Sequence, residues 1–245
     1  MIIKRETIRQ LKKFVSGTNE KEEDLYLYVN DDKEIYIVNF HKVHVYLSYL
    51  KLGETEELGV GVRLIQGEYA PLRKYLNKVR VSDLLYLTFD ETGADLDLYD
   101  IKSNESVNHR ISWTNEDIRL DLSYFIEQRG NEYHIRKKDF KCIGLYKDNC
   151  SKICIGNGTI TFKFYHDKEH IVHAKHVICD TYDNQDNGCF HAHNIYLLRL
   201  LDKFINDEVI TLWLSEDKPL FIESDDYIGL LAPRILFDGD IEERI

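Results

Sequence analysis

The sequence has few of the residues that mark several common classes of protein. Its 245 residues include three prolines, one methionine and five cysteines. An odd number of cysteines argues against a disulfide framework and is typical of reduced thiols. No stretch approaches the roughly 18 apolar residues that a membrane span needs, and the first residues lack the apolar stretch of a signal peptide. We therefore expect an intracellular protein with no membrane partner.

Motifs for catalysis are also scarce, since the chain has neither a Gly-x-x-x-x-Gly-Lys-Ser/Thr phosphate loop nor a Cys-x-x-Cys pair. The best indication of an enzyme is a group of possible zinc ligands: His166, His170, His173, His176, Cys179, Cys189, His191 and His193. A strand over residues 170–179 would divide these side chains between two faces, whereas zinc needs three or four converging ligands. A His/Cys zinc-dependent enzyme is thus the less favoured alternative. We predict no catalytic residue, no metal and no cofactor.

Four segments have the apolar spacing of amphipathic helices. In the second of them the apolar side chains recur at i, i+3, i+4 and i+7 from Leu72, and Pro71 suits the first helical turn. The four predicted helices cover residues 6–15, 69–80, 136–148 and 193–204.

Between these helices the apolar period changes to two, which is typical of strands. The predicted strands cover residues 25–29, 34–38, 43–52, 84–89, 95–99, 153–155, 159–164, 171–179, 209–214 and 219–222. Each half of the chain then reads helix, hairpin, long strand, helix and closing hairpin, and the matching helices begin 130 and 124 residues apart. The order indicates an internal duplication. We predict an α+β protein with similar domains at 1–112 and 133–245, joined by a connector at 113–132 within the polar stretch 104–132.

Charge is sorted between the two kinds of element. The whole chain has a formal net charge of −11, yet the four helical windows hold 14 basic and 4 acidic residues. Helices that merely favoured Lys and Arg as good helix formers would carry Glu partners as well. The distribution therefore favours four helices that face a common polyanion.

Two segments near the carboxyl end of the chain carry recognisable motifs. Residues 210–223 contain a strand that ends in Ser-Glu-Asp-Lys-Pro-Leu, and residues 230–235 read Leu-Leu-Ala-Pro-Arg-Ile. These segments resemble the closing segments of PCNA-type DNA sliding clamps. Residues 40–50, Phe-His-Lys-Val-His-Val-Tyr-Leu-Ser-Tyr-Leu, are similar to the central loop and following strand of that family. The resemblance covers nearly the whole chain. It implies two clamp domains per subunit, with four helices on the inner face, antiparallel sheets outside and an interdomain connector.

The resemblance also implies a non-enzymatic function: a ring of three subunits that encircles double-stranded DNA independently of sequence. The cations expected to face DNA are Arg9, Lys12, Lys13, Arg73, Lys74, Lys78, Arg80, Lys137, Lys138, Lys141, Lys147, Arg199 and Lys203. They would contact phosphates without reading bases, so that the ring can slide.

Partner proteins are expected to dock by short peptides in a groove on the outer face, as in the family. The implied groove residues are Phe40, Val43, His44, Val45, Leu122, Phe125, Ile126, Tyr133, Pro219, Leu231, Ala232, Pro233 and Arg234. DNA polymerase and other replication and repair enzymes would bind there, and a separate ATP-dependent clamp loader would open the ring.

Two alternatives keep the fold and change the assembly. The chain could be one subunit of a heterotrimeric or checkpoint clamp, or a viral processivity factor that acts as a monomer. The expected location follows the source: the nucleus in a eukaryote, the nucleoid region of the cytoplasm in an archaeon, or the host cell for a virus.

Overall fold

The computed structural model describes most of the chain, and it divides into two compact units. Unit 1 contains residues 1–123 and 225–227, and unit 2 contains residues 124–224 and 228–245. The described residues are 1–43, 45–80, 83–100, 104–118, 120, 122–156, 159–166, 171–179, 188–202, 209–215, 218–233 and 242–243, with only the backbone described at His173, His176, Ile178, Cys179, Glu242 and Glu243.

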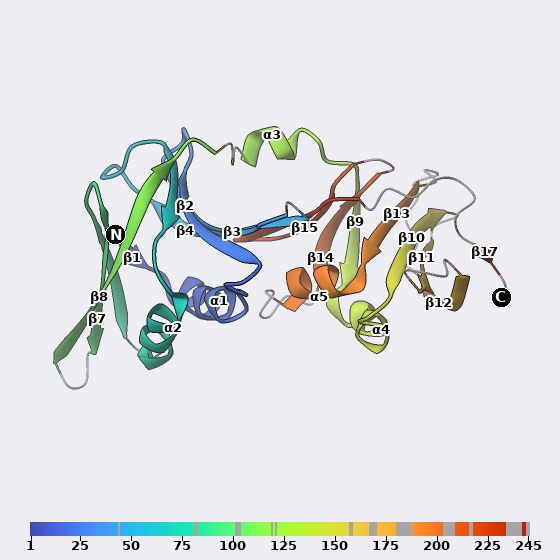
Figure 1. Ribbon diagram of the computed structural model, residues 1–245, viewed down its shortest axis with the longest axis horizontal. Coiled ribbons are helices and arrows are strands. Elements are labelled where there is room, and N and C mark those ends of the chain that lie inside the picture. Colours follow the sequence, from blue (N-terminus) through green and yellow to red (C-terminus); the bar gives the residue numbers. More distant parts are fainter. Residues whose placement is uncertain are drawn as a thin grey trace. The chain divides into compact units, whose positions relative to one another are not determined.

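Unit 1 contains two helices and eight strands in its described part (Figure 1). Their order is β1 (Ile2–Ile3), α1 (Arg5–Ser16), β2 (Glu23–Val29), β3 (Glu34–His41), β4 (Tyr46–Glu54), β5 (Gly61–Ile65), α2 (Tyr69–Lys78), β6 (Leu84–Phe89), β7 (Gly93–Asp100) and β8 (Glu105–Glu116). The hydrogen-bonded strand order is β1-β6-β7-β8-β5-β2-β3-β4.

A short helix, α3 (Leu122–Ile126), follows β8. The described elements of unit 2 are then β9 (Asn131–Arg136), the 3-10 helix η1 (Lys137–Phe140), α4 (Lys141–Leu145), β10 (Cys150–Gly156), β11 (Thr159–Tyr165), β12 (Ile171–Cys179), β13 (Gly188–His193), α5 (Asn194–Asp202), β14 (Val209–Leu214), β15 (Leu220–Ser224), β16 (Tyr227–Leu231) and β17 (Glu242–Glu243). Its strands pair in the orders β16-β15-β14-β9 and β13-β10-β11-β12-β17.

The strand orders confirm the α+β class and the duplicated plan. The order β1-β6-β7-β8 corresponds to β9-β14-β15-β16, and the order β5-β2-β3-β4 corresponds to β13-β10-β11-β12. In each unit one helix follows the first strand and a second helix follows the fifth. Both units therefore have the same topology.

The core of unit 1 forms where its helices cover the sheet. Leu11 of α1, Leu72 of α2 and Trp113 of β8 line the same small apolar void. The other face of the sheet carries Tyr28 and Tyr36, which stack at 6.0 Å between ring centroids, and Tyr49, which donates a hydrogen bond to the Leu120 carbonyl at 3.5 Å. Leu120, which follows β8, thus contacts β4 on this aromatic face.

The sequence-based boundaries were wrong at two places. The polar stretch 104–132 contains strand β8, in which the alternate residues His109, Ile111 and Trp113 are less exposed than their neighbours, and also the start of β9. Polar residues on the solvent face masked that alternation. The third predicted helix is shorter than 136–148, since η1 and the single turn α4 are followed by a break at Tyr146.

Strands β1, β5, β9, β13, β16 and β17 were not predicted either. They are short, and β5, for example, pairs with β2 and β8, which lie elsewhere in the sequence. In the part of the chain that the structure describes, no helix is long and apolar enough to cross a membrane.

Candidate nucleic-acid interface

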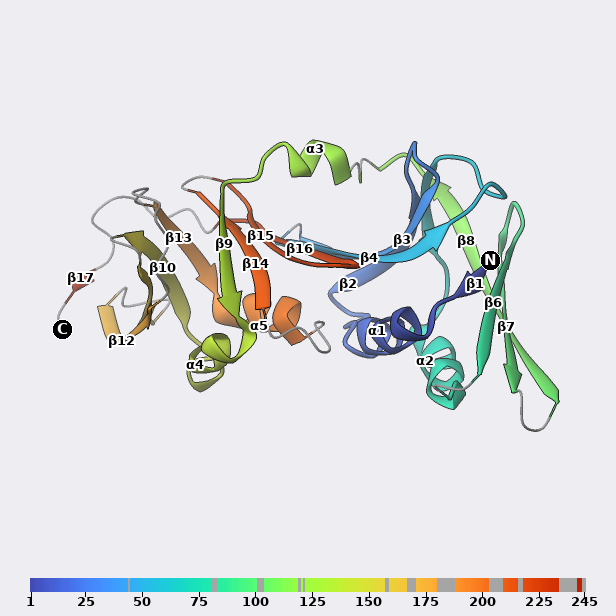
Figure 2. The same cartoon turned by 180° about the vertical axis from the view of Figure 1, so that it is seen from behind.

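Helices α1 and α2 lie side by side in unit 1 (Figures 1 and 2). Each buries its apolar stripe, with Leu11 on α1 and Leu76 on α2 almost fully covered. Arg9 on α1 is exposed, and Lys74 and Lys78 on α2 are exposed one helical turn apart. Because residues at i and i+4 lie on one face of a helix, the solvent face of α2 presents two cations together.

Arg5 also belongs to this cationic face, although it was not among the predicted cations. Helix α1 begins at Arg5, one residue earlier than predicted. Arg5 is exposed and precedes Arg9 by four residues, so both lie on the solvent face of α1. The i, i+4 spacing was available as a signal, but residue 5 lay outside the predicted helical window.

Two of the predicted cations bind the protein itself. Arg73 of α2 donates Nε–H to the Val15 carbonyl at 3.0 Å, donates a second hydrogen bond to the Thr18 carbonyl, and forms an ion pair with Glu20 at 3.1 Å. Lys12 of α1 donates its ammonium to the Val79 carbonyl just beyond α2. Each helix thus caps the carboxyl end of the other, where unsatisfied carbonyls attract cations.

The cap at Lys12 has an electrostatic consequence. Lys12 is half-buried, and desolvation lowers its pKa, while the nearby Asp83 carboxylate opposes that shift. The Lys12 ammonium is therefore bound to a main-chain carbonyl of unit 1 and is less accessible to solvent than the side chains of Arg9 and Lys74. The structure shows an intramolecular role for Lys12 and Arg73 that the sequence did not predict.

The end of α2 is mixed in charge. Lys78 and Arg80 share a hollow of about 140 Å³ with the carboxylates Asp83, Asp100 and Glu105. Acidic neighbours reduce the positive potential that a phosphate would meet there. Lys13 is half-buried on α1. The most positive surface of unit 1 is therefore expected at Arg5, Arg9 and Lys74.

In unit 2 the cations gather around a hollow next to α5. Its volume is about 550 Å³, and its cationic lining consists of Arg136, Lys137, Lys138 and Lys141, with Asp202 as the one acidic lining residue among those described. Phe140, Leu198, Leu201 and Val209 supply the apolar part of the lining. The sequence analysis named three of these cations and missed Arg136, which ends β9 and is paired with Asp139 at 3.1 Å.

The remaining predicted cations of unit 2 differ in setting. Lys147 is exposed beyond α4, and Arg199 on α5 is half-buried with its guanidinium 5.8 Å from the centre of the Tyr196 ring. Lys203 lies outside the described residues. Helices α4 and α5 contact each other, so the cations of α4 and η1 lie close to α5.

The predicted peptide-groove residues fall in both units. In unit 1, Val43 is 69% exposed, Phe40 and Val45 are half-buried and Leu122 is buried, while His44 lies outside the described residues. In unit 2, Ile126 and Ala232 are exposed, Phe125, Pro219 and Pro233 are half-buried, Tyr133 and Leu231 are buried, and Arg234 lies outside the described residues. Val43, Ile126 and Ala232 therefore offer the accessible apolar surface among these residues.

The segment that follows α3 is anchored within unit 2 by Arg129. Its guanidinium lies 4.8 Å from the centre of the Trp213 ring and forms an ion pair with Glu223 at 2.8 Å. Trp213 donates Nε1–H to the same carboxylate at 2.9 Å. At Gly130 an added Cβ would lie 2.4 Å from the Leu214 carbonyl, so only glycine fits this close approach. The end of the connector is thus fixed to β14 and β15.

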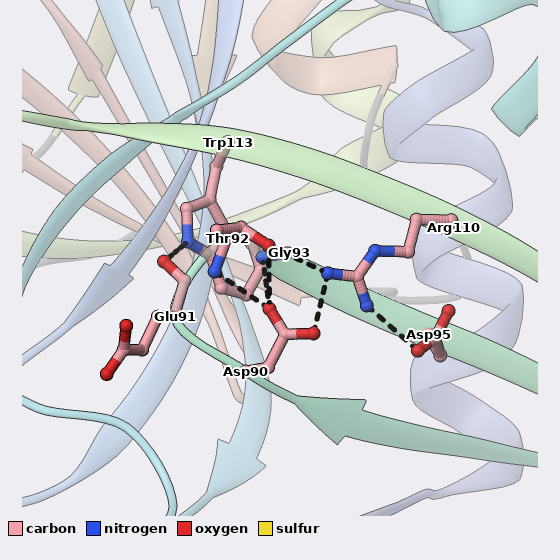
Figure 3. A network of polar contacts seen from close by, with 7 residues as sticks. All are labelled: Asp90, Glu91, Thr92, Gly93, Asp95, Arg110 and Trp113. Carbon is pink, nitrogen blue, oxygen red and sulfur yellow. Dashed lines mark hydrogen bonds and ion pairs between the residues drawn. The ribbon is translucent and has the colours of Figure 1, made fainter.

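A polar network fixes the start of β7 and the middle of β8, as Figure 3 shows. Arg110 forms ion pairs with Asp90 at 2.6 Å and with Asp95 at 2.9 Å. The Asp90 carboxylate also accepts hydrogen bonds from the Thr92 and Gly93 amides. The hydrogen bond from the Thr92 amide and the Arg110 guanidinium hold the pKa of Asp90 at about 2. Across residues 105–112, the ladder of β8 that the structure describes is with β7 alone.

The histidine and cysteine candidates whose side chains are described do not form a metal-binding group. No group of three or more His, Cys, Asp or Glu in the described part of the chain is placed to hold a metal ion. Cys150 Sγ lies 3.2 Å from His193 Nδ1, and Tyr165 Oη lies 3.3 Å from His191 Nδ1. His166 is exposed, His170 lies outside the described residues, and only the backbone is described at His173, His176 and Cys179.

Comparison with known proteins gives a match at the level of structure. No protein-family model and no curated protein matches the sequence. Among solved structures, a chain from the crystal structure of the PCNA2–PCNA3 complex of Sulfolobus tokodaii matches with a TM-score of 0.67 and 12% identity. The match covers 95% of this chain and 98% of that chain.

The chain therefore has the fold of a DNA sliding clamp. More narrowly, the fold is that of the PCNA type, with two clamp domains of the same topology in one chain. This confirms the resemblance drawn from residues 40–50, 210–223 and 230–235.

Proposed function

We propose that the protein is a sliding-clamp subunit that encircles duplex DNA and tethers replication and repair enzymes to it. One observation carries the proposal: a chain of net charge −11 with the PCNA-type fold concentrates exposed cations on its helices. They include Arg5, Arg9, Lys74 and Lys78 in unit 1 and Lys138 and Lys141 in unit 2, while Lys147 is exposed just beyond α4.

The physical reason lies in how clamps hold DNA. Lys and Arg side chains contact phosphates without reading base edges, so binding does not depend on sequence. Retention then comes from the closed ring, and the charges only keep the duplex centred. A polymerase bound to such a ring meets the primer end at high effective concentration, which is the basis of processivity.

Self-association into a ring would use open strand edges. Over residues 105–112 the described ladder of β8 is with β7 alone, and Val107 in that stretch is 42% exposed. The described ladder of β12 with β17 ends at Val172, and Val177 beyond it is 45% exposed. An open edge with exposed apolar residues is a template for pairing with another chain. We propose that β8 of one subunit pairs with β12 of the next and that three subunits close the ring.

A heteromeric ring is the second candidate, because the structural neighbour is a complex of two different PCNA chains. Sedimentation of the purified protein separates the candidates. A species near three times 29.0 kDa is expected for the homotrimer. A monomer would exclude the homotrimer and favour a heteromeric clamp or a monomeric processivity factor.

The DNA-binding surface is tested by charge reversal in both units. Lys74→Glu with Lys141→Glu is expected to weaken binding to a short duplex at low salt. It should also reduce the slope of log K against log salt by roughly 2, one unit for each lost phosphate contact. Lys33→Glu, in the turn between β2 and β3, is the control for each single reversal and should leave the slope unchanged.

Encirclement is tested by topology. After loading by the cognate ATP-dependent loader, the wild-type protein should stay on a nicked circular plasmid and leave the same plasmid once it is linearised. Equal loss from both plasmids, or unchanged binding in the double variant, would reject the proposed function.

A further inference from the structure

Two cysteines of unit 2 lie directly opposite each other in neighbouring strands. Cys154 of β10 pairs in register with Cys189 of β13 in an antiparallel ladder. Their sulfur atoms are 3.0 Å apart, and neither residue is in a disulfide bond. The proposed function uses neither residue.

The backbone already has the spacing that a disulfide requires. Disulfides join residues whose Cα atoms lie about 4.4–6.8 Å apart. Directly opposed residues of an antiparallel pair lie about 4.5 or 5.5 Å apart, depending on their hydrogen bonding. A bond between Cys154 and Cys189 therefore fits the existing ladder without a change of register.

The other cysteines with described side chains have different neighbours. Cys142 contacts the Asp139 carbonyl at 3.4 Å, and Cys150 contacts His193 Nδ1 at 3.2 Å. Both are buried, whereas Cys154 and Cys189 are half-buried and within reach of a small solute. Among these four cysteines, the register of β10 and β13 brings the thiols of Cys154 and Cys189 together.

The surroundings of the pair set its reactivity. Lys152 lies two residues before Cys154 in β10 and pairs with His191 of β13, so this pair lies on the same face of the sheet as the two cysteines. On the other side of β10, Lys163 of β11 pairs with Lys152. The hydrogen bond with Cys189 and burial raise the pKa of the Cys154 thiol, while the Lys163 and Lys152 ammonium groups oppose the shift. Because the thiolate is the nucleophile, exchange should be slow at neutral pH and faster at alkaline pH.

We propose that Cys154 and Cys189 are a reversible oxidation site that forms an intrachain disulfide with a low-molecular-weight disulfide such as oxidised glutathione. One protein thiolate attacks a glutathione sulfur and releases one glutathione thiolate, which gives a mixed disulfide. The second protein thiolate then attacks the protein sulfur of that bond and releases the second glutathione thiolate. The two protein thiols lose two protons and two electrons in all, and one glutathione disulfide becomes two glutathione thiols.

The bond would join two adjacent strands of the sheet β13-β10-β11-β12-β17. It closes a loop between positions 35 apart in sequence, which contains β11 and β12. Strand β13 leads directly into α5, which carries Arg199. Oxidation would therefore stabilise the part of unit 2 from which α5 begins.

The test treats the full-length protein with oxidised glutathione at pH 8.5 and measures intact mass, peptide mapping and thermal unfolding. The expected product has lost the mass of two hydrogen atoms, with Cys154 linked to Cys189. Its unfolding midpoint should rise by roughly 5 °C or more, and dithiothreitol should reverse both changes. Cys142→Ser, a matched cysteine variant, should behave as wild type.

Cys154→Ser and Cys189→Ser should each retain the original midpoint after oxidation and carry at most a glutathione adduct. Reversal of the wild-type protein by dithiothreitol provides a reading that needs no variant, should either substitution prevent folding. A map that links other cysteines would overturn the proposal. So would stable glutathione adducts on the wild-type pair, or thiols that resist oxidation yet are alkylated in denaturant.

Discussion

Arg73 of α2 donates Nε–H to the main-chain carbonyl of Val15 in α1 at 3.0 Å, across 58 residues of sequence. Lys12 of α1 makes the reciprocal contact with the Val79 carbonyl at the end of α2. The two helices that carry the candidate DNA-binding cations of unit 1 are thus tied together by cations of their own. Charge on these helices has two separate roles, helix capping and ligand attraction.

Removal of the Arg73 cap is expected to destabilise unit 1. In Arg73→Met the carbonyls of Val15 and Thr18 lose the hydrogen bonds that the Arg73 guanidinium donates, and the free energy of unfolding should fall by about 1–3 kcal/mol. Urea denaturation followed by circular dichroism measures the change. Lys74→Met, at the neighbouring exposed position, is the control and should stay within about 0.5 kcal/mol of wild type. Equal stability of the two variants would contradict the capping role.

If partner peptides bind in the proposed groove, the accessible apolar residues of the groove should determine the affinity. An exposed valine elsewhere on the protein should not. Val43→Asp or Ala232→Asp should weaken the binding of a clamp-binding peptide from a polymerase at least tenfold, because a buried unpaired carboxylate is costly. Isothermal titration calorimetry gives the affinity.

Val60→Asp is the matched control for the groove, since Val60 is also an exposed valine of unit 1, at 51% against 69% for Val43. It should bind the peptide as wild type does. Unchanged affinity in both Val43→Asp and Ala232→Asp would remove the groove from these positions.

The anchor at Arg129 should control how firmly the connector end is held. Glu223→Gln keeps the shape of the side chain and removes the charge that pairs with Arg129, so opening of residues 124–130 should become more frequent. Hydrogen exchange of the amides in that segment measures it, with about a tenfold faster rate expected. Glu132→Gln, an exposed carboxylate nearby in sequence, should leave exchange unchanged. Equal exchange in both variants would show that the ion pair does not hold the segment.

The pH dependence of stability should include a contribution from His109. Its ring stacks on Tyr75 at 5.1 Å between centroids, and desolvation lowers its pKa below 6.5. The unfolded state then binds a proton more readily than the folded state. Stability is therefore full above the unfolded pKa, and it is lost as pH falls through about 6.5 toward the lowered folded value.

The measurement is the unfolding midpoint of wild type and His109→Gln between pH 7.5 and 5.5. The wild-type midpoint should fall more steeply with decreasing pH than that of the variant, and the difference between the two isolates this histidine from the others. Parallel curves would mean that His109 has the same pKa in both states.

Local pattern was enough to predict α1, α2 and the larger part of the strand set. Helix α1 (Arg5–Ser16) lies within one residue of its predicted bounds at each end, because its apolar stripe is a property of consecutive residues. Strand β8 was not predicted, because its apolar residues between Val107 and Trp113 lie among exposed polar residues. Its pairing with β7, which defines it as a strand, is a property of the folded chain.

By itself the sequence determined the duplicated α+β plan, the clamp resemblance and the concentration of cations on the helices. The reason is that apolar periodicity, the order of elements and the placement of charge are properties of consecutive residues. Only the tertiary structure decided which cations are available. Arg73 and Lys12 reach carbonyls 58 and 67 residues away, whereas Arg9 and Lys74 remain exposed. The same holds for Cys154 and Cys189, which the register of β10 and β13 brings together. Contacts between distant residues depend on how the elements pack, and packing is a property of the whole fold.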